Sequence, residues 1–157
     1  MHGHINISTL SELECHRAVD RLGLLKWLGS FSVGDDAVDS QHRRFFDLAA
    51  TIPMLIDSDA PDAEVRAAIR MLHTDAISHF TQEEALLAEI AFTGTDRHRI
   101  AHQDLAYAFS ELVREIDRQE DIHALGAIAH QMVMALLEHM LSEDMLYKSH
   151  LMRSRGL

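Results

Sequence analysis

The chain of 157 residues contains little of what interrupts helices or builds sheets. It has 7 glycines and 2 prolines, its aromatic content is 6%, and runs of β-branched residues are nearly absent. Because β-branched and aromatic residues favour strands while Gly and Pro mark loops, this composition argues against a sheet. A hydrophobic content of 47% is still enough to bury the core of one domain. We therefore expect a helical protein with few loops.

Cysteine and positive charge are also scarce. The single cysteine, Cys15, excludes an intramolecular disulfide and fits a reducing compartment. Lys and Arg number 14 against 25 Asp and Glu, which gives a formal net charge of -11. Nucleic acid and anionic membrane surfaces would repel such a chain, so we expect neither as a partner. No stretch resembles a signal peptide or a spanning helix, and the sequence therefore predicts a cytoplasmic protein.

Apolar residues recur at helical spacing in four long segments separated by short polar stretches. Asp39 would cap the first segment and Asp62 the second, and the others open near Asp96 and Asp121. The third segment carries the apolar series Ile100, Leu105, Phe109, Leu112 and Ile116. We predict helices over about 39–57, 62–90, 96–116 and 121–150. Since such short connections make successive helices antiparallel, the expected fold is all-α, an up-down-up-down four-helix bundle with an N-terminal extension.

The predicted bundle leaves a segment at each end of the chain. We assign residues 1–26 to an N-terminal extension or linker, 27–150 to the bundle and 151–157 to a C-terminal tail. Ser11 to Leu28 could form a short helix, because leucines recur there at loosely helical spacing. Residues 31–34 are expected to be an extended lead-in to the first helix. The extension either packs on the bundle or links it to a larger parent chain.

The chain holds 12 histidines, roughly three times the average share. Five of them join two carboxylates in a spaced series, namely His42, His79, Glu83, His98, His102, His139 and Asp144. Partners within one segment lie four or five residues apart, so they can share a helix face. Imidazole and carboxylate ligands suit iron, zinc or manganese, and seven are too many for one ordinary centre. The series predicts two metal ions, bridged by the carboxylates, inside the bundle.

The residues alone leave two questions open. A His and a Glu one turn apart, such as His79 and Glu83, are by themselves more often an incidental exposed pair than a metal site. In the fourth segment Glu143 lies four residues after the last histidine of the series and Asp144 lies five, so helical periodicity alone favours Glu143. Glu84 is adjacent to Glu83 but points about 100° away around the helix. Ligands on all four predicted helices favour the metal site over a chance scatter of histidines.

The series resembles the ligand signature of the hemerythrin family. That signature comprises His42, His79-x-x-x-Glu83, His98-x-x-x-His102 and His139-x-x-x-x-Asp144. The flanking Val33-Gly34, Asp39-Ser40-Gln41 and Tyr147 resemble the bacterial branch, the bacteriohemerythrins. The resemblance covers about residues 27–147 and fills all seven ligand positions. Because the family uses the fifth position after the last histidine, the resemblance selects Asp144 over Glu143.

The resemblance implies a non-haem di-iron centre, oxo- or hydroxo-bridged, that binds O2 reversibly. By analogy, the three histidines of the series after Glu83 would bind one six-coordinate iron. His42 and His79 would bind the second iron, which keeps an open position for O2, and Glu83 and Asp144 would bridge the two. Gln41 could orient a ligand from outside the ligand set. The expected function is O2 carriage, storage or delivery, without enzyme activity.

The sequence departs from the family at residue 135. The family usually has Trp one turn before the fourth-helix histidine, where this chain has Ala135. The exchange removes a large apolar wall unless another side chain fills the space. Side chains that could fill it are Phe45, Leu105, Met132, Trp27 and Phe31. If none does, we expect water and anions to reach the centre, with faster autoxidation and some peroxide chemistry.

Three other functions fit the same residues. The extension before Trp27 could couple the iron state to a signalling partner or to another domain of a parent chain, as in an O2 or redox sensor module. A pocket opened at Ala135 could instead support a di-iron peroxidase or oxidase. The third alternative is a bundle that holds zinc, or no metal, in the cell.

Overall fold

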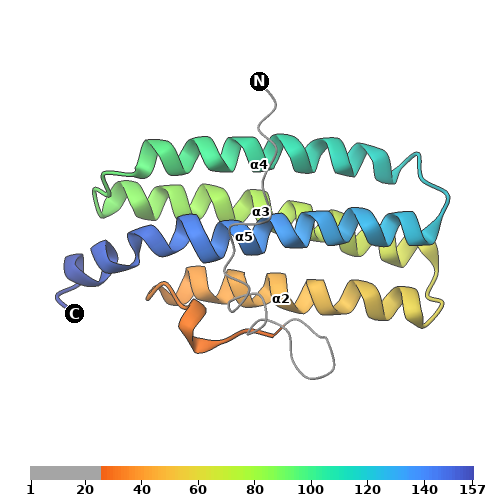
Figure 1. Ribbon diagram of the computed structural model, residues 1–157, viewed down its shortest axis with the longest axis horizontal. Helices are drawn as coiled ribbons and strands as arrows, with labels where there is room; N and C mark the ends of the chain where they lie inside the picture. The colour runs from red at the N-terminus through yellow and green to blue at the C-terminus, as the bar shows by residue number, and fades with distance from the viewer. Residues whose placement is uncertain (1–25) are drawn as a thin grey trace.

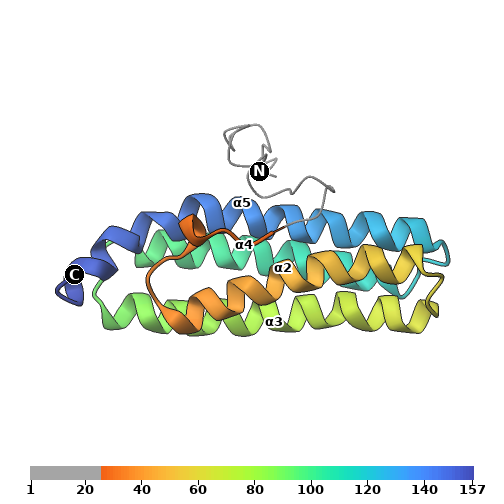
Figure 2. The same cartoon turned by 90° about the horizontal axis from the view of Figure 1, so that it is seen from below.

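The computed structural model describes residues 26–157, which form four long helices (Figures 1 and 2). A single 3-10 turn, η2 (Gly29–Phe31), precedes α2 (Asp36–Asp57), α3 (Asp62–Glu89), α4 (Thr95–Ile116) and α5 (Ile122–Ser154). Both α2 and α4 pack against α3 and α5, so each helix is antiparallel to its two neighbours. No strand occurs in residues 26–157. The predicted all-α, up-down-up-down four-helix bundle is confirmed, whereas the N-terminal extension and most of the Ser11–Leu28 helix lie outside the described residues.

Three details of the helix ends differ from the sequence prediction. Asp62 does not cap α3, because Pro61 is the N-cap and Asp62 is the first helical residue. The C-terminal end of α5 also differs. This helix continues to Ser154, so the predicted end near His150 is wrong. Leu151 is fully buried and packs in one cluster with Val33 and Tyr147. The apolar face of α5 therefore extends one turn further than expected, and the first part of the predicted 151–157 tail is helical.

The start of α2 is the third difference, because Asp39 is not the N-cap. Asp35 takes that role, and its Oδ1 accepts hydrogen bonds from the backbone N–H groups of Ala37 and Val38. Asp39 lies in the first turn of α2 and is buried. Its Oδ1 accepts a hydrogen bond from Val33 N at 2.9 Å and its Oδ2 accepts one from the Ser32 hydroxyl. Asp39 thus fixes the lead-in, whose extended part begins after Phe31 because Phe31 ends η2.

Ile100 is the one member of the apolar series in α4 that the structure places at the surface, with 58% of its area exposed. It lies two residues from both His98 and His102, which are buried. Two residues correspond to about 200° around a helix, so a side chain midway between two inward histidines points outward. The histidines, rather than the apolar residue, therefore define the inner face of this turn.

The direction of the helices brings the predicted ligands to one end of the bundle. The N-terminal halves of α2 and α4 lie beside the C-terminal halves of α3 and α5, at the end where the chain terminates (Figure 1). The seven predicted ligands all belong to these halves. One hydrophobic cluster, including Phe45, Phe80 and Met140, lies on one side of them, and a smaller one with Val38 and Leu87 lies on the other. The polar site is therefore closed along the bundle axis by apolar side chains.

The apolar character of α5 has a structural explanation. By length and composition alone this helix could span a membrane, since its most apolar window has a mean hydropathy of 1.3. Half of that window is buried inside the bundle, and the buried face of the helix includes His139 and Asp144. We attribute the hydropathy to the core position of α5, which contacts α2, α3 and α4.

The role of Asp39 can be tested by its stability contribution. Asp39→Ala leaves the buried Val33 N–H without an acceptor, so we expect the free energy of unfolding to fall by about 1–3 kcal/mol. Asp39→Asn retains a side-chain oxygen for this N–H and is expected to lose clearly less. Urea unfolding of the three proteins measures the difference. Equal losses in both variants would contradict this role.

Candidate metal centre

All seven predicted ligands converge in the structure. His42 comes from α2, His79 and Glu83 from α3, His98 and His102 from α4, and His139 and Asp144 from α5. Each is buried, with at most 5% of its area exposed. They form two sets whose ligand atoms lie within 4.8 Å of one another, and Glu83 and Asp144 belong to both sets. One set adds His98, His102 and His139, and the other adds His42 and His79. The two sets divide the residues in the way that the family resemblance implied.

Asp144, rather than Glu143, faces the site. Asp144 is fully buried, with Oδ2 3.2 Å from His42 Nε2 on α2 and Oδ1 2.9 Å from His139 Nε2 on its own helix. Glu143 turns outward, and its Oε1 accepts a hydrogen bond from Arg97 Nη2 at 2.8 Å. Helical periodicity misleads here because it selects the residue directly beside His139. A carboxylate that belongs to both sets must instead reach His139 and His42 of α2 at once, as Asp144 does.

The geometry around Asp144 fits a cation. Neither of its oxygens has a hydrogen bond, although His139, His42 and His98 each place an Nε2 within 3.3 Å of one of them. The Nε2 atoms of His42 and His79 lie 3.2 Å apart, and those of His102 and His139 lie 3.0 Å apart. Imidazole nitrogens and carboxylate oxygens this close, buried and poorly hydrogen-bonded, are costly unless a positive charge lies among them. The donor set suits a transition-metal ion.

Two side chains outside the set orient its histidines. Gln41 Oε1 lies 2.7 Å from His79 Nδ1, and Glu84 Oε1 lies 3.0 Å from His102 Nδ1. A proton on Nδ1 satisfies each contact and leaves the Nε2 lone pair free to face the site. The role suggested for Gln41 agrees with this geometry. The contact of Glu84 with His102 is not predicted from the sequence. Glu84 points away from Glu83 around the helix, and the structure shows that this direction leads to His102 of α4 rather than into solvent.

Tyr147 forms a hydrogen bond with Glu83, the carboxylate shared by both sets. Its hydroxyl donates a hydrogen bond to Glu83 Oε1 at 2.5 Å, and both side chains are fully buried. Burial and the adjacent Glu83 charge raise the pKa of the Tyr147 hydroxyl above its usual range, so the hydroxyl remains a donor. The tyrosine therefore fixes the position of Glu83 from the side of the smaller hydrophobic cluster.

Electrostatics in the site favour positive charge. Burial and the Asp144 charge would raise the pKa of Glu83, but hydrogen bonds from His102 and His98 bring it to about 2. Burial alone would lower the pKa of His98, but the same two carboxylates raise it to about 9. At His79 the effect of burial is larger than that of the two carboxylate charges, and the pKa is lowered to about 4. The two carboxylates thus remain ionised and attract either protons or metal cations to the imidazoles.

Comparison with known proteins agrees with this arrangement. The model of the family described as Hemerythrin HHE cation binding domain matches residues 33–151. The chain belongs to the hemerythrin family. A bacteriohemerythrin of Clostridium acetobutylicum is 27% identical over 126 residues, which are 77% of this chain and 96% of that protein. A myohemerythrin of Riftia pachyptila is 28% identical over 125 residues, 80% of this chain and 92% of the relative.

The bacterial branch is supported by further hemerythrin relatives. A bacteriohemerythrin of Campylobacter jejuni is 23% identical over 82 residues, covering 52% of this chain and 62% of that protein. The span matched by the hemerythrin model runs from the lead-in to the last turns of α5 and includes all seven predicted ligands. The predicted membership of the family and of its bacteriohemerythrin branch is confirmed.

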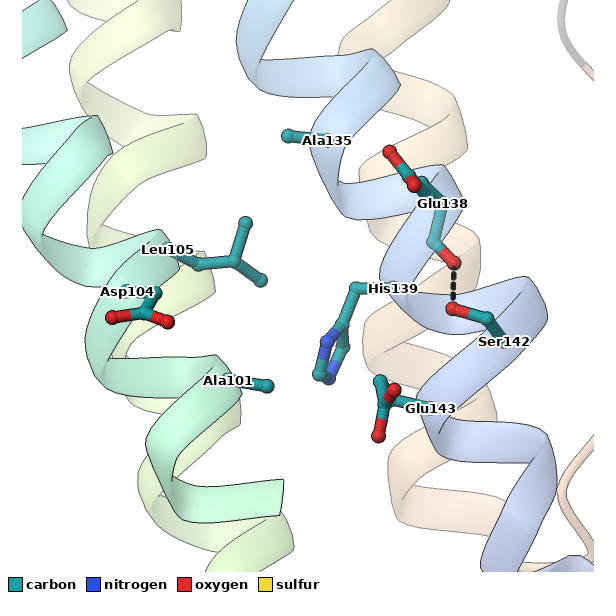
Figure 3. Close-up of a pocket in the computed structure, with 8 residues that line it drawn as sticks. All are labelled: Ala101, Asp104, Leu105, Ala135, Glu138, His139, Ser142 and Glu143. Atoms are coloured by element: carbon teal, nitrogen blue, oxygen red, sulfur yellow. Dashed lines mark hydrogen bonds between the residues drawn. The ribbon is translucent and has the colours of Figure 1, made fainter. Parts of the chain in front are cut away.

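At the position of the usual hemerythrin tryptophan, the structure has a pocket of about 240 Å³ between α4 and α5 (Figure 3). It is lined by Ala101, Asp104, Leu105, Ala135, Glu138, His139, Ser142 and Glu143. The His139 ring lies between the two helices at this pocket, while Ala135 leaves the space above it open (Figure 3). The pocket therefore reaches the set with three histidines, not the one with two.

None of the side chains considered as substitutes fills this pocket. Leu105 forms part of its wall, and Phe45 lies at a different cavity between α2 and α5. Met132 is fully buried in the larger hydrophobic cluster and does not line the pocket. Trp27 and Phe31 pack against Phe46 of α2, with ring centroids 5.8 and 5.7 Å from it. The expected opening at Ala135 is thus present. Its carboxylates Asp104 and Glu143, however, favour water and cations over the anions that we also expected.

Removal of the Glu84 contact should weaken the metal site without touching the ligand set. Glu84→Ala leaves His102 Nδ1 without its acceptor, and we expect metal affinity to fall by about 10–100-fold. Glu84→Gln keeps an oxygen for this N–H and should retain most of the affinity. Glu89→Ala, an exposed position on the same helix, is the control. Competition with a chelator for Co²⁺ measures the affinities, and equal values for all four proteins would contradict the role.

Proposed function

We propose that this hemerythrin-family chain binds O2 reversibly at a non-haem di-iron centre and serves O2 carriage, storage or delivery. The observation that carries the proposal is the division of seven buried residues into two sets that share Glu83 and Asp144. Two shared carboxylates are the arrangement by which a helical bundle holds two metal ions side by side. The names of the relatives, bacteriohemerythrin and myohemerythrin, support the same function.

The two sets would hold the two irons unequally. His98, His102 and His139, with the shared carboxylates, provide five side chains for one ion. His42 and His79 with the same carboxylates provide four, so the second ion retains room for an external ligand. When bound, the irons with their oxo or hydroxo bridge supply the electrons and the coordination position that O2 requires. The protein contributes the asymmetry that directs O2 to the side of His42 and His79.

Reversibility is supported by the composition of the donor set. Five neutral imidazoles and two carboxylates donate less negative charge than the carboxylate-dominated sets of di-iron oxidases. A less electron-rich centre is less prone to drive O2 to bond cleavage. This argument favours O2 binding over oxidation of a substrate, and we propose no enzyme activity.

Apolar side chains cover the set with two histidines. The Phe45 ring centroid lies 5.4 Å from that of His79 and 6.3 Å from that of His42. The half-buried Trp27 ring lies 6.4 Å from His42. Aromatic walls of this kind would keep water from the position that O2 would take, which would slow oxidation of the irons. The shielding is expected of a carrier and does not depend on Ala135.

The first test is iron content together with the visible spectrum of the anaerobically reduced protein. We expect two irons per chain and a charge-transfer band that appears with O2 and disappears on degassing. Irons that oxidise once and never release O2 would overturn reversible binding in favour of the oxidase or peroxidase alternative. A chain that binds zinc or no metal would overturn the di-iron proposal itself.

The same measurement on two neighbouring variants tests the ligand assignment. Asp144→Asn removes a charge shared by both sets, so we expect loss of the two-iron stoichiometry and of the O2 band. Glu143→Gln, one residue away and directed outward, should still hold two irons at saturation. The reverse result would show that helical periodicity, and not the buried geometry, identifies the ligand.

The open pocket gives a prediction for autoxidation. Water that enters at Ala135 approaches His139 and raises the local dielectric constant, which favours separation of charge and oxidation of the irons. Ala135→Trp fills the space, so we expect the variant to autoxidise several-fold more slowly than the wild type. The decay of the O2 band in air-saturated buffer measures both rates. Equal rates would show that the pocket does not control access of solvent.

The sensor alternative has one observation in its favour. Trp27 contacts the rings of Phe31 and Phe46, lies beside His42 and has the Arg43 guanidinium 5.1 Å from its ring centroid. Trp27 would thus connect the preceding residues of the chain with His42. Through this contact a signalling partner or a domain of a parent chain could respond to binding of O2. Absence of any change in Trp27 fluorescence between the reduced and O2-bound protein would count against this alternative. The cytoplasm remains the expected location, from the single cysteine.

A further inference from the structure

The pocket between α4 and α5 differs from the rest of the site in one respect: a predicted ligand forms part of its wall. His139 is the most exposed of the seven, at 5%, and the others are between 0% and 2% exposed. Its ring lines the pocket (Figure 3), while its Nε2 lies 3.0 Å from His102 Nε2 and 2.9 Å from Asp144 Oδ1. One side chain therefore connects the pocket with the interior of the centre.

Charge around the pocket selects for cations. Asp104 of α4 faces Glu143 of α5 across it (Figure 3). The guanidinium of Arg97 pairs with Glu143 and offsets part of its charge, but this pair is at the surface and Asp104 adds a second carboxylate at the opening. Carboxylates gathered at an opening raise the local concentration of cations and repel anions.

Size also fits a hydrated metal ion. An octahedral aqua ion carries six waters, and at about 30 Å³ for each water these occupy roughly 180 Å³. The pocket has a volume of about 240 Å³. It can therefore admit a divalent ion before the ion has lost its water, which small hard cations release reluctantly.

A second pocket next to the centre is a poorer route. It borders His79, has a volume of about 90 Å³ and is lined in part by Gln41, Arg44 and Asp75. Arg44 brings a positive charge there and pairs with Asp75, which leaves little negative charge to attract a cation. Its volume is also less than half that of the α4–α5 pocket.

We propose that the α4–α5 pocket is the route by which hydrated divalent metal ions reach the buried centre, with His139 as the first ligand that an incoming ion meets. This inference rests on the proposed di-iron function and adds the path of loading to it. Asp104 and Glu143 attract the ion, and Ala135 keeps the space open above His139. The small residue in place of the usual tryptophan would thus serve metal uptake.

Anaerobic stopped-flow mixing of metal-free protein with Co²⁺ tests the route, since Co²⁺ absorbs visibly when bound by imidazole and carboxylate. We expect Asp104→Asn combined with Glu143→Gln to slow uptake by roughly tenfold at low ionic strength and to approach the wild-type rate at about 1 M salt. Ala135→Trp should slow uptake at both salt concentrations. Ser78→Trp, which fills the pocket beside His79, is the matched control and should load at the wild-type rate.

A route changes the rates of uptake and release together and leaves affinity unchanged. All variants should still bind two Co²⁺ per chain at saturation, and Ala135→Trp should keep wild-type affinity, with release to a chelator slowed by the same factor as uptake. Unchanged uptake in both pocket variants, weakened affinity in Ala135→Trp, or slowing by Ser78→Trp instead would overturn the route. Wild-type protein that fails to bind two ions would overturn the di-iron function, which is a different result.

Discussion

The structure depends on two ionised carboxylates, Glu83 and Asp144, buried at the centre of a helical bundle. A buried charge is tolerated only when it is paired, and these two are surrounded by five imidazoles from all four helices. Neither oxygen of Asp144 has a hydrogen bond, so the imidazoles alone do not satisfy it. A pair of metal ions would. The proposed metal therefore also holds the four helices together at this end of the bundle.

The surroundings of the carboxylates follow from that requirement. Tyr147 fixes Glu83 from the smaller hydrophobic cluster, and Gln41 and Glu84 orient one histidine in each set. Aromatic rings cover the side with two histidines, where O2 would bind. The side with three histidines is open to solvent through the pocket at Ala135. The larger pocket thus lies beside the set with three histidines, and a smaller one, lined in part by Phe45 and His79, lies beside the set with two.

This division separates two properties that a hemerythrin needs. The proposed carriage of O2 would require water to be excluded from the bound O2, while the proposed metal would have to enter a bundle in which the seven predicted ligands are almost completely buried. An opening next to His139 lies between α4 and α5, whereas His42 and His79 belong to α2 and α3. Such an opening would admit the metal without exposing the position proposed for O2. The carboxylates Asp104 and Glu143 at the opening would repel anions from the proposed metal. A tryptophan in place of Ala135 would fill the opening beside His139.

The sequence by itself determined the bundle and predicted the seven residues that the structure brings together. Helical periodicity, short connections and pairs of ligands one turn apart are local properties, which residue order contains. The choice of Asp144 over Glu143 needed either a family resemblance or the position of His42 on another helix, because periodicity favours the wrong residue. Only the tertiary structure decided that Glu84 contacts His102, that Asp39 fixes the lead-in instead of capping α2, and that Ile100 faces solvent. Each depends on which helix lies opposite, and spacing along one chain segment does not contain that information.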